Sequence, residues 1–212
     1  MSFARVNAHE TLDEFKLFSK VPVINSLSDW YHPCQALADT LTLSEYYSDL
    51  SECTLSYIGD GNNVAHSLLN AGALVGFNVN VITPVGREVN AKVLSFAKSV
   101  AEVKGIKINT GNDLELLNST DVIYTDTWVS MGDDTPLTQV KAEFMDYQVN
   151  ETLMQTYNIK HFMHCQPVHR GFEATDEVCD GEGSLMLPQS NNRLWAQCAL
   201  LVYLMAPENL TV

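Results

Sequence analysis

Two polar segments of the sequence contain side chains that could bind and orient an amine. Residues 126–132 read DTWVSMG and residues 161–170 read HFMHCQPVHR, and each segment follows or includes a short apolar run that predicts a β-strand. If these strands are parallel, their carboxyl ends meet at one edge of a sheet, where α/β proteins bind ligands. A carboxylate at Asp126 could hold an amine there, although a single acidic loop residue is more often only solvated.

The histidines of the second segment argue weakly for a metal. His161, His164 and His169 lie with Cys165 within nine residues, a composition that also fits zinc. On a strand, however, the side chains of His161 and His164 point to opposite faces. No second pair of cysteines supports a structural zinc site. We therefore expect no metal, and we interpret the segment as a strand that ends in a polar loop.

Two other segments could supply hydrogen-bond donors. In the run His32-Pro33-Cys34-Gln35 the proline suits the first turn of a helix. His32 and Gln35 would then share one face and could donate to a carbonyl or phosphate oxygen. A surface capping turn explains the same residues equally well.

The turn GDGNN at residues 59–63 lies between a predicted strand and a predicted helix, where free backbone N–H groups can meet a ligand. A tight turn closed by an asparagine cap is the simpler interpretation. A dinucleotide fingerprint would need a third glycine near Val64 and an acidic residue after the next strand, where the sequence reads Thr83-Pro84. We therefore do not expect a dinucleotide.

The elements that must position these segments form an α/β pattern. Apolar runs that predict strands alternate with amphipathic helical stretches, which favours a mostly parallel sheet. Strands are expected near residues 3–6, 22–25, 55–58, 79–82, 106–108, 122–124 and 161–164. Helices are expected from a capping box at Thr11 and Glu14, after Pro33, over residues 64–75 and 89–100, up to about residue 157, and at about residues 191–205. The last of these has Leu194, Cys198, Leu201 and Met205 on one face.

Composition excludes several other classes of protein. The chain has 212 residues, 46% of them apolar, and a formal net charge of -14 without a basic run, which argues against nucleic-acid binding. No apolar run approaches the roughly 18 residues of a membrane span, and the N-terminus lacks the features of a secretory signal. Five cysteines without CxxC spacing suit a reducing compartment. We therefore expect a cytoplasmic protein.

Five motifs then occur in one order: HPCQALAD, GDGNNVAHSL, TDTWVSMGDD, MHCQPVHRG and NNRLWAQ. The set resembles the ornithine carbamoyltransferase family, whose members contain HPxQ, DxxNN, D-x-W-x-SMG, HCLP and ENR in that order. The resemblance extends from about Arg5 to Leu204. It implies a remnant of a carbamoyl-phosphate-binding domain at residues 1–46 and a Rossmann-like ornithine-binding domain, a parallel sheet flanked by helices, at residues 47–187. A C-terminal helix at residues 188–212 would return toward the first domain.

The resemblance also implies an activity and a set of site residues. The family transfers the carbamoyl group of carbamoyl phosphate to ornithine, which gives citrulline and phosphate, and it needs no metal or organic cofactor. The residues implied to hold carbamoyl phosphate are Arg5, His32, Gln35 and Arg193. The residues implied to bind ornithine or lie beside its amine are Asn63, Asp126, Ser130, Met131, Cys165 and Gln166. Of these, Cys165, Asp126, His32 and Arg5 are the expected catalytic residues.

These residue types suit the implied chemistry. The attacking amine has a reference pKa near 10.4, so its neutral form costs about 4–5 kcal/mol at pH 7. An acid and a thiol nearby could orient the amine, and either the thiol or the departing phosphate could take its proton. Aspartate is a less suitable substrate because Asp126, Ser130 and Met131 offer no cation for a second carboxylate. Putrescine and an acylated ornithine stay open as alternatives to ornithine.

The sequence also departs from the family pattern. Family members have an S-T-R-T-R segment that binds the phosphate, and no such motif occurs here. Gln166 replaces the leucine of HCLP, and Asn191 replaces the glutamate of ENR beside Arg193. We therefore expect an N-terminally truncated chain with weak catalysis of its own. It could form a family-like homo-oligomer, although the trimer-forming domain would be mostly absent. The alternatives are an impaired homologue that binds ornithine and a chain that needs a partner chain.

Overall fold

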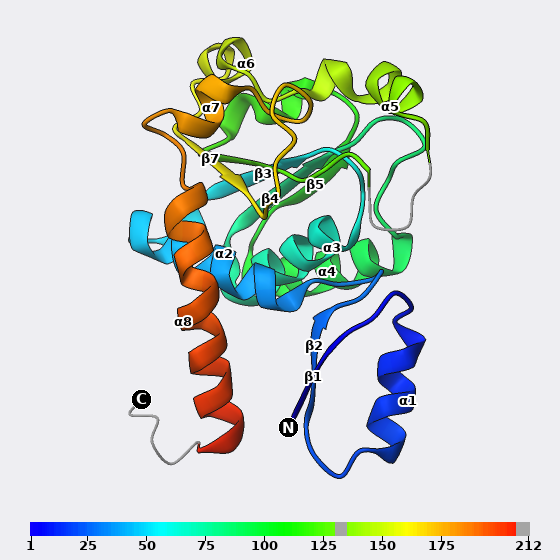
Figure 1. Ribbon diagram of the computed structural model, residues 1–212. Coiled ribbons are helices and arrows are strands. Elements are labelled where there is room, and N and C mark those ends of the chain that lie inside the picture. The colour runs from blue at the N-terminus through cyan, green and yellow to red at the C-terminus, as the bar shows by residue number, and fades with distance from the viewer. Residues whose placement is uncertain (130–134, 207–212) are drawn as a thin grey trace.

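The computed structural model describes residues 1–129 and 135–206. Its centre is a parallel sheet with the strand order β5-β4-β3-β6-β7 (Figure 1). The strands are β3 (Thr54–Ile58), β4 (Asn78–Ile82), β5 (Ile108–Gly111), β6 (Val122–Thr125) and β7 (His161–His164). The fold class expected from the alternating pattern, a parallel sheet flanked by helices, is therefore confirmed.

Helices cover both faces of the sheet (Figure 1). One face is covered by α2 (Pro33–Tyr46), α3 (Asn63–Ala71), the π-helical turn η2 (Gly72–Gly76) and α4 (Ala91–Lys104). The other is covered by the 3-10 helices η3 (Leu114–Ser119) and η4 (Met145–Tyr147) and by α5 (Leu137–Phe144), α6 (Glu151–Thr156) and α7 (Asp176–Asp180). A short 3-10 helix, η1 (Leu50–Glu52), leads into β3.

Alternation along the strands builds the two halves of the core. On β3, Leu55 and Tyr57 pack toward α3 and α4, whereas Ile58 joins the opposite cluster with Ile123 and Phe162. Successive side chains of a strand point to opposite faces, so a strand that is buried on both sides must be apolar throughout. The sheet is thus a rigid platform, and the loops that leave its carboxyl edge begin at strands that are buried on both faces.

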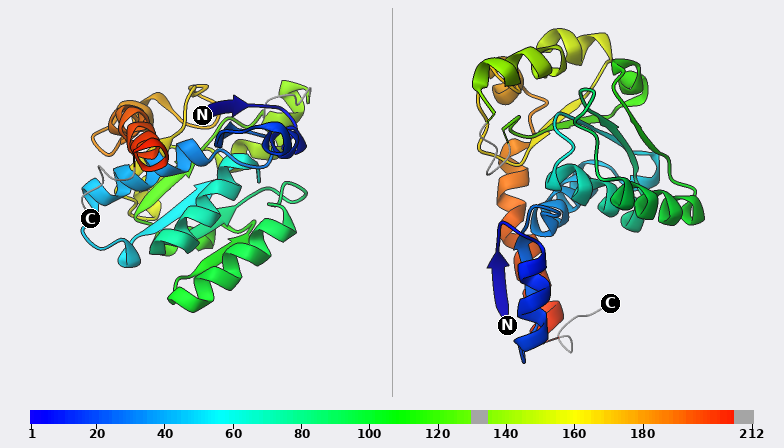
Figure 2. Two further views of the ribbon diagram at one scale, coloured as in Figure 1. Left: turned by 90° about the horizontal axis from the view of Figure 1, so that it is seen from below. Right: turned by 90° about the vertical axis from the view of Figure 1, so that its right-hand side faces the viewer.

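A second unit lies beside this platform. The strands β1 (Ser2–Arg5) and β2 (Val23–Leu27) pair in parallel and are joined by α1 (Glu10–Phe18). The last helix, α8 (Met186–Met205), packs against α2. Figure 2 shows that the far half of α8 and the unit β1–α1–β2 extend in the same direction, away from the sheet. None of the helices in the described residues is long and apolar enough to cross a membrane.

Three details differ from the sequence-based expectations. The capping box at Thr11 is wrong, because α1 begins at Glu10 and its cap position, His9, makes no side-chain cap. The helix after residue 63 is α-helical only to Ala71 and then widens into η2. The last helix begins at Met186, and its apolar face is largely exposed: Leu194 is 62% exposed and Met205 is 68% exposed. The polar residues Gln189 and Asn192 are buried instead, because they bond to α2.

Candidate active site

The strand order creates a switch point at the carboxyl edge of the sheet. From β3 the chain passes to β4 and β5 on one side, and β6 and β7 lie on the other. The register pairs Ile58 with Thr125 and Thr125 with His164. The residues that follow the three strands therefore emerge side by side, at the position where open α/β sheets bind ligands.

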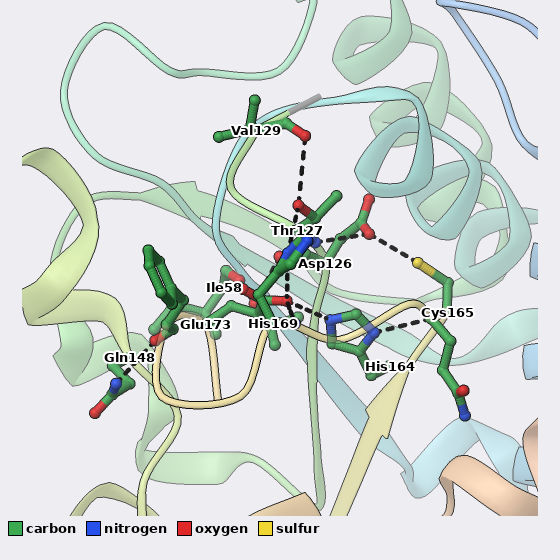
Figure 3. A network of polar contacts seen from close by, with 12 residues as sticks. Ile58, Asp126, Thr127, Val129, Gln148, His164, Cys165, His169 and Glu173 are labelled. Carbon is green, nitrogen blue, oxygen red and sulfur yellow. Dashed lines mark hydrogen bonds and ion pairs between the residues drawn. The ribbon is translucent and has the colours of Figure 1, made fainter. Parts of the chain in front are cut away.

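Asp126 and Cys165 meet at this edge. The Cys165 thiol donates to Oδ1 of Asp126 over 2.9 Å, and the backbone N–H of Thr127 donates to the same oxygen over 2.8 Å. Figure 3 shows the sulfur of Cys165 pointing at the carboxylate. Asp126 is buried, and Cys165 is partly buried. Two of the residues expected from the sequence thus form one hydrogen-bonded pair.

Asn62 supplies the third member of this group. Its Nδ2 donates to Oδ2 of Asp126 over 2.8 Å. Its Oδ1 caps α3 by accepting from the backbone N–H groups of Val64 and Ala65. A side chain that caps a helix is fixed by that helix, so the amide is held rigidly against the carboxylate. The sequence predicts an asparagine cap in this turn, but the residue it implies for substrate binding is the next one, Asn63.

Asn63 points elsewhere. Its Nδ2 donates to the carbonyl oxygen of Ser28 over 2.6 Å and so ties the start of α3 to the loop before α2. Ser67 of α3 makes a second tie, because its hydroxyl accepts from the backbone N–H of His32 over 2.7 Å. The role of Asn63 toward a substrate stays a prediction, and the amide that borders Asp126 in the structure is that of Asn62.

The electrostatics of the pair favour a neutral thiol. Burial raises the pKa of the Cys165 thiol well above its ordinary value, and the neighbouring carboxylate of Asp126 raises it further. The hydroxyl of Tyr57 also stays neutral, because burial raises its pKa and the charge of Asp126 acts in the same direction. Both groups therefore keep their protons beside Asp126, and the thiol remains a hydrogen-bond donor to it.

A second group gathers around His32, which stands at the cap position of α2 with Pro33 in the first turn. Burial, followed by the charges of Arg193 and Arg5, lowers the pKa of His32 to about 4. The ring is therefore neutral at physiological pH, and its Nδ1 is buried without a protein partner. Gln35 accepts from Nη1 of Arg193 over 2.6 Å. The structure thus gathers Arg5, His32, Gln35 and Arg193 from β1, α2 and α8.

The remaining residues expected at the site are Gln166, Ser130 and Met131. Gln166 is exposed and adopts a positive φ of 58°, while its backbone N–H donates to Nδ1 of His164 over 2.8 Å. Ser130 and Met131 lie outside the described residues.

Under the loop that contains Cys165 and Gln166, the buried Glu173 accepts from the backbone N–H of His169. Its Oε1 lies 3.4 Å from Nε2 of His164, so one carboxylate contacts both ends of this loop (Figure 3). Sequence reasoning did not single out Glu173.

The histidines of this region contact protein side chains and backbone groups. Nδ1 of His161 lies 2.7 Å from the hydroxyl of Tyr47, on the side of η1 and α2. His164 instead faces Gln166 and Glu173. Across residues 1–129 and 135–206, the structure contains no group of three or more His, Cys, Asp or Glu side chains that could hold a metal ion.

Comparison with known proteins gives matches along nearly the whole chain. Residues 1–45 match the family description "Aspartate/ornithine carbamoyltransferase, carbamoyl-P binding domain", and residues 51–204 match "Aspartate/ornithine carbamoyltransferase, Asp/Orn binding domain". The ornithine carbamoyltransferase of Vibrio sp. (strain 2693) is 52% identical over 202 residues, which cover 95% of this chain and 67% of that protein. The chain thus spans about two thirds of that relative's length.

The chain is also similar to solved structures of carbamoyltransferases. The ornithine carbamoyltransferase of Pyrococcus furiosus superposes with a TM-score of 0.92 at 40% identity, covering 99% of this chain and 67% of that one. The anabolic ornithine carbamoyltransferase of Campylobacter jejuni gives 0.89 at 36% identity, with coverages of 95% and 68%. An acetylornithine transcarbamylase complexed with acetylcitrulline gives 0.84 at 25% identity, with coverages of 95% and 67%.

Proposed function

Because this chain belongs to the aspartate/ornithine carbamoyltransferase family, we propose that it takes part in carbamoyl transfer to ornithine. The carbamoyl group of carbamoyl phosphate passes to the side-chain amine, which gives citrulline and phosphate. The amine-binding group at the carboxyl edge of the sheet carries this proposal. There the side chain of Asp126 accepts hydrogen bonds from Asn62, Thr127 and the Cys165 thiol.

The Asp126 carboxylate orients the ornithine amine. A primary ammonium with a pKa near 10.4 binds beside a carboxylate, and only its neutral form attacks. Cys165 is a poor acceptor for the released proton, because its thiol already donates to Asp126. We propose that the departing phosphate takes this proton and that Cys165 keeps Asp126 in place. Ser130 and Met131, which follow Asp126 in the sequence, are proposed to complete the ornithine site with Asn63.

The second group provides donors for the carbonyl oxygen as it becomes an oxyanion. Arg5 and Arg193 supply these donors, and their charges lie close to the neutral ring of His32, which adds no charge of its own. Gln35 fixes the guanidinium of Arg193. Donors aimed at a developing oxyanion act in the transition state more than in the ground state, and one such donor is worth about 10²–10³ in rate.

Ornithine is favoured over the other amines. Relatives called ornithine carbamoyltransferase reach 52% identity, whereas the acetylornithine transcarbamylase is 25% identical. Putrescine lacks the α-amino and carboxylate groups that an amino-acid site would hold. We propose ornithine, with putrescine and acylated ornithine as the compounds to test against it.

The second candidate function is ornithine binding with slow turnover by this chain alone. The chain spans about two thirds of them, and its 212 residues contain no S-T-R-T-R motif for the phosphate. Without backbone N–H groups and arginines at the phosphate, the leaving group is poorly held. We propose that this chain by itself binds ornithine but turns over slowly, and that a segment supplying the phosphate site raises the rate.

Citrulline formation by the purified chain, with Asp126→Asn as the control, tests the transfer. Slow formation that the substitution abolishes supports it, whereas formation at a rate typical of enzymes contradicts the proposed need for a further segment. Calorimetric titration with ornithine tests the amine site separately. A folded chain that neither binds ornithine nor forms citrulline would contradict the assignment of Asp126.

A further inference from the structure

A buried carboxyl joins the two groups of the candidate site. Asp39 lies in α2, one helical turn after Gln35, and its side chain is fully buried. Its Oδ1 accepts from Nε2 of Gln35 over 2.8 Å and from Nε2 of Gln189 over 2.7 Å. Gln35 and Gln189 are themselves buried, and they come from different helices 154 positions apart in the sequence (189 minus 35). Asp39 is thus the meeting point of two glutamine side chains.

Each glutamine leads to a different half of the site. Oε1 of Gln35 accepts from Arg193, the cation of the carbamoyl side, over 2.6 Å. Oε1 of Gln189 accepts over 3.0 Å from the backbone N–H of His164, the residue before Cys165. A continuous series of hydrogen bonds therefore runs from Arg193 through Asp39 to the backbone N–H of His164, the residue before Cys165.

The direction of every bond in this chain is fixed by its ends. A guanidinium and a backbone N–H can only donate, so each glutamine must turn its oxygen outward to them. Both glutamine NH₂ groups then face inward, where only a group that accepts twice can satisfy them. Asp39 is that group, and a buried donor left without an acceptor is costly.

The groups that act on the charge of Asp39 all belong to this series of hydrogen bonds or contact it. Burial raises the pKa of Asp39 to about 7, while the bonds from Gln35 and Gln189, the Tyr124 hydroxyl and the charge of Arg193 oppose that rise. Tyr124 of β6 accepts from Gln189 over 3.1 Å, so the chain is anchored to the sheet as well.

We propose that Asp39 and Gln189 are positioning residues that hold the carbamoyl-side group, Gln35 and Arg193, at a fixed spacing from the backbone of His164 and thus from the adjoining Cys165. This inference rests on the function proposed above, because it assigns the two ends to the two substrates. Transfer requires the carbonyl carbon and the amine nitrogen within about 3–3.5 Å of each other, so the two half-sites must keep one spacing.

The same two helices offer a matched control. Asn192 of α8 is buried and donates to Thr42 over 3.0 Å and to Glu45 over 2.7 Å, both on α2. These bonds join α2 to α8 about one turn further along and lead to neither half of the site. If Asp39 only fastened the helices together, Asn192→Leu would have the same effect as Asp39→Leu.

The test compares amide hydrogen exchange and nitrogen resonances in four variants of the whole chain. Asp39→Leu removes both acceptor bonds, Asp39→Asn retains an acceptor oxygen, Gln189→Met breaks only the branch to His164, and Asn192→Leu is the control. The His164 amide reports the amine side, and the Arg193 guanidinium reports the carbamoyl side. The internal reference is the amide of Phe162, which lies in the same strand as His164 and donates to the Gly183 carbonyl over 2.9 Å.

In Asp39→Leu we expect exchange at His164 to speed up about tenfold relative to Phe162, with a shifted Arg193 signal. Gln189→Met should change His164 alone, Asp39→Asn should restore most of both signals, and Asn192→Leu should change neither. Unchanged exchange at His164 in Asp39→Leu overturns the inference, as does an equal effect of Asn192→Leu. If Asp39→Leu does not fold, the Gln189→Met pattern decides.

Ornithine affinity separates this inference from the proposed function. By calorimetry, we expect Asp39→Leu and Gln189→Met to weaken ornithine binding by ~3-fold or more, and Asn192→Leu to leave it unchanged. Wild-type chain that does not bind ornithine contradicts the proposed function, whereas the exchange measurement still decides whether Asp39 couples the two groups. Full ornithine affinity in a folded Asp39→Leu variant would contradict the coupling alone.

Discussion

The Cys165 thiol donates a hydrogen bond to the Asp126 carboxylate over 2.9 Å, which is the reverse of what a nucleophilic cysteine requires. Reactive thiols lie beside cations or helix N-termini that stabilise the thiolate. Here burial and an anion both raise the pKa of the thiol. The pair is therefore built to keep a carboxylate in place and to attract a cation, which suits an amine substrate and argues against covalent catalysis by Cys165.

Asp126→Asn should lower the pKa of the Cys165 thiol, because the substitution removes the anion that raises it. We expect alkylation at pH 8 to speed up by about tenfold or more, since each pKa unit changes the thiolate fraction about tenfold in this range. The measurement is the pH–rate profile of alkylation by iodoacetamide. A Cys198→Ser background removes the exposed thiol that would react first.

Asp60→Asn is the matched control for this substitution. Asp60 lies in the neighbouring loop, and its charge raises the pKa of Tyr57, whereas the carboxylates that raise the pKa of Cys165 are those of Asp126 and Asp39. Its alkylation profile should match that of the wild-type chain. An unchanged profile in Asp126→Asn would contradict the proposed pairing.

His32 and Asp39 should give opposite pH dependences of stability. The pKa of His32 falls from 6.5 to about 4, so its contribution is present above pH 6.5 and is lost as the pH falls toward 4. The pKa of Asp39 rises from 3.8 to about 7, so its contribution is present below pH 3.8 and is lost as the pH rises toward 7. At about 1.4 kcal/mol per pKa unit, each changes the free energy of unfolding by on the order of 3 kcal/mol.

Urea unfolding between pH 4 and 7 measures these two contributions. Relative to the wild-type chain, Asp39→Asn should gain stability as the pH rises, because the opposing contribution of Asp39 is gone. His32→Asn should instead gain stability as the pH falls. If the free energy of unfolding of both variants differed from that of the wild-type chain by a constant amount across this range, the pKa values of His32 and Asp39 would not be shifted by burial as stated above.

The sequence predicted the platform better than the contacts that tune the site. Each central strand is a short apolar run, so its position could be read directly, and the loops after β6 and β7 followed from it. Asp39 and Gln189 could not be found in this way, because they are 150 positions apart and polar, and only their burial against each other reveals them. The asparagine cap expected in the turn at residues 59–63 is present, and it is formed by Asn62.

The last helix shows the same limit from the apolar side. Periodicity selected Leu194 and Met205 as one face, yet that face is exposed. A pattern of apolar residues shows that a surface can be buried, but the pattern does not say by what. The buried residues of α8, Gln189 and Asn192 among them, are chosen by hydrogen-bonding partners on α2, which are invisible to a periodicity argument.

Arg193→Met should raise the pKa of His32. The charge of Arg193 is the second cause of the low value, after burial, so the pKa should move upward from about 4 without reaching 6.5. The titration of the His32 ring by NMR measures the change. Arg170→Met is the control, because Arg170 pairs with Asp176 and Asp180 at the surface and does not act on His32. A His32 pKa that stays at its wild-type value would show that the two side chains do not meet.

Gly61→Ala should damage the amine side through the backbone. A Cβ at Gly61 would overlap the carbonyl oxygen of Arg87, which already accepts from the Gly61 N–H over 2.9 Å. Neither loop can yield without moving Asn62, the residue that joins the α3 cap to Asp126. We expect a loss of about 1–3 kcal/mol in the free energy of unfolding, together with weaker ornithine binding.

Gly111→Ala, at the end of the edge strand β5, is the control for this prediction. The nearest atom to its added Cβ is the tip of Leu116 at 3.2 Å, a side chain that can move aside. We expect unchanged ornithine affinity and a stability change within about 0.5 kcal/mol. Urea unfolding and calorimetry with ornithine measure both variants. Of these two glycines, Gly61 is the one whose added Cβ would meet backbone atoms. Equal losses in the two variants would therefore show that the position of Asn62 does not depend on the close approach of the two loops.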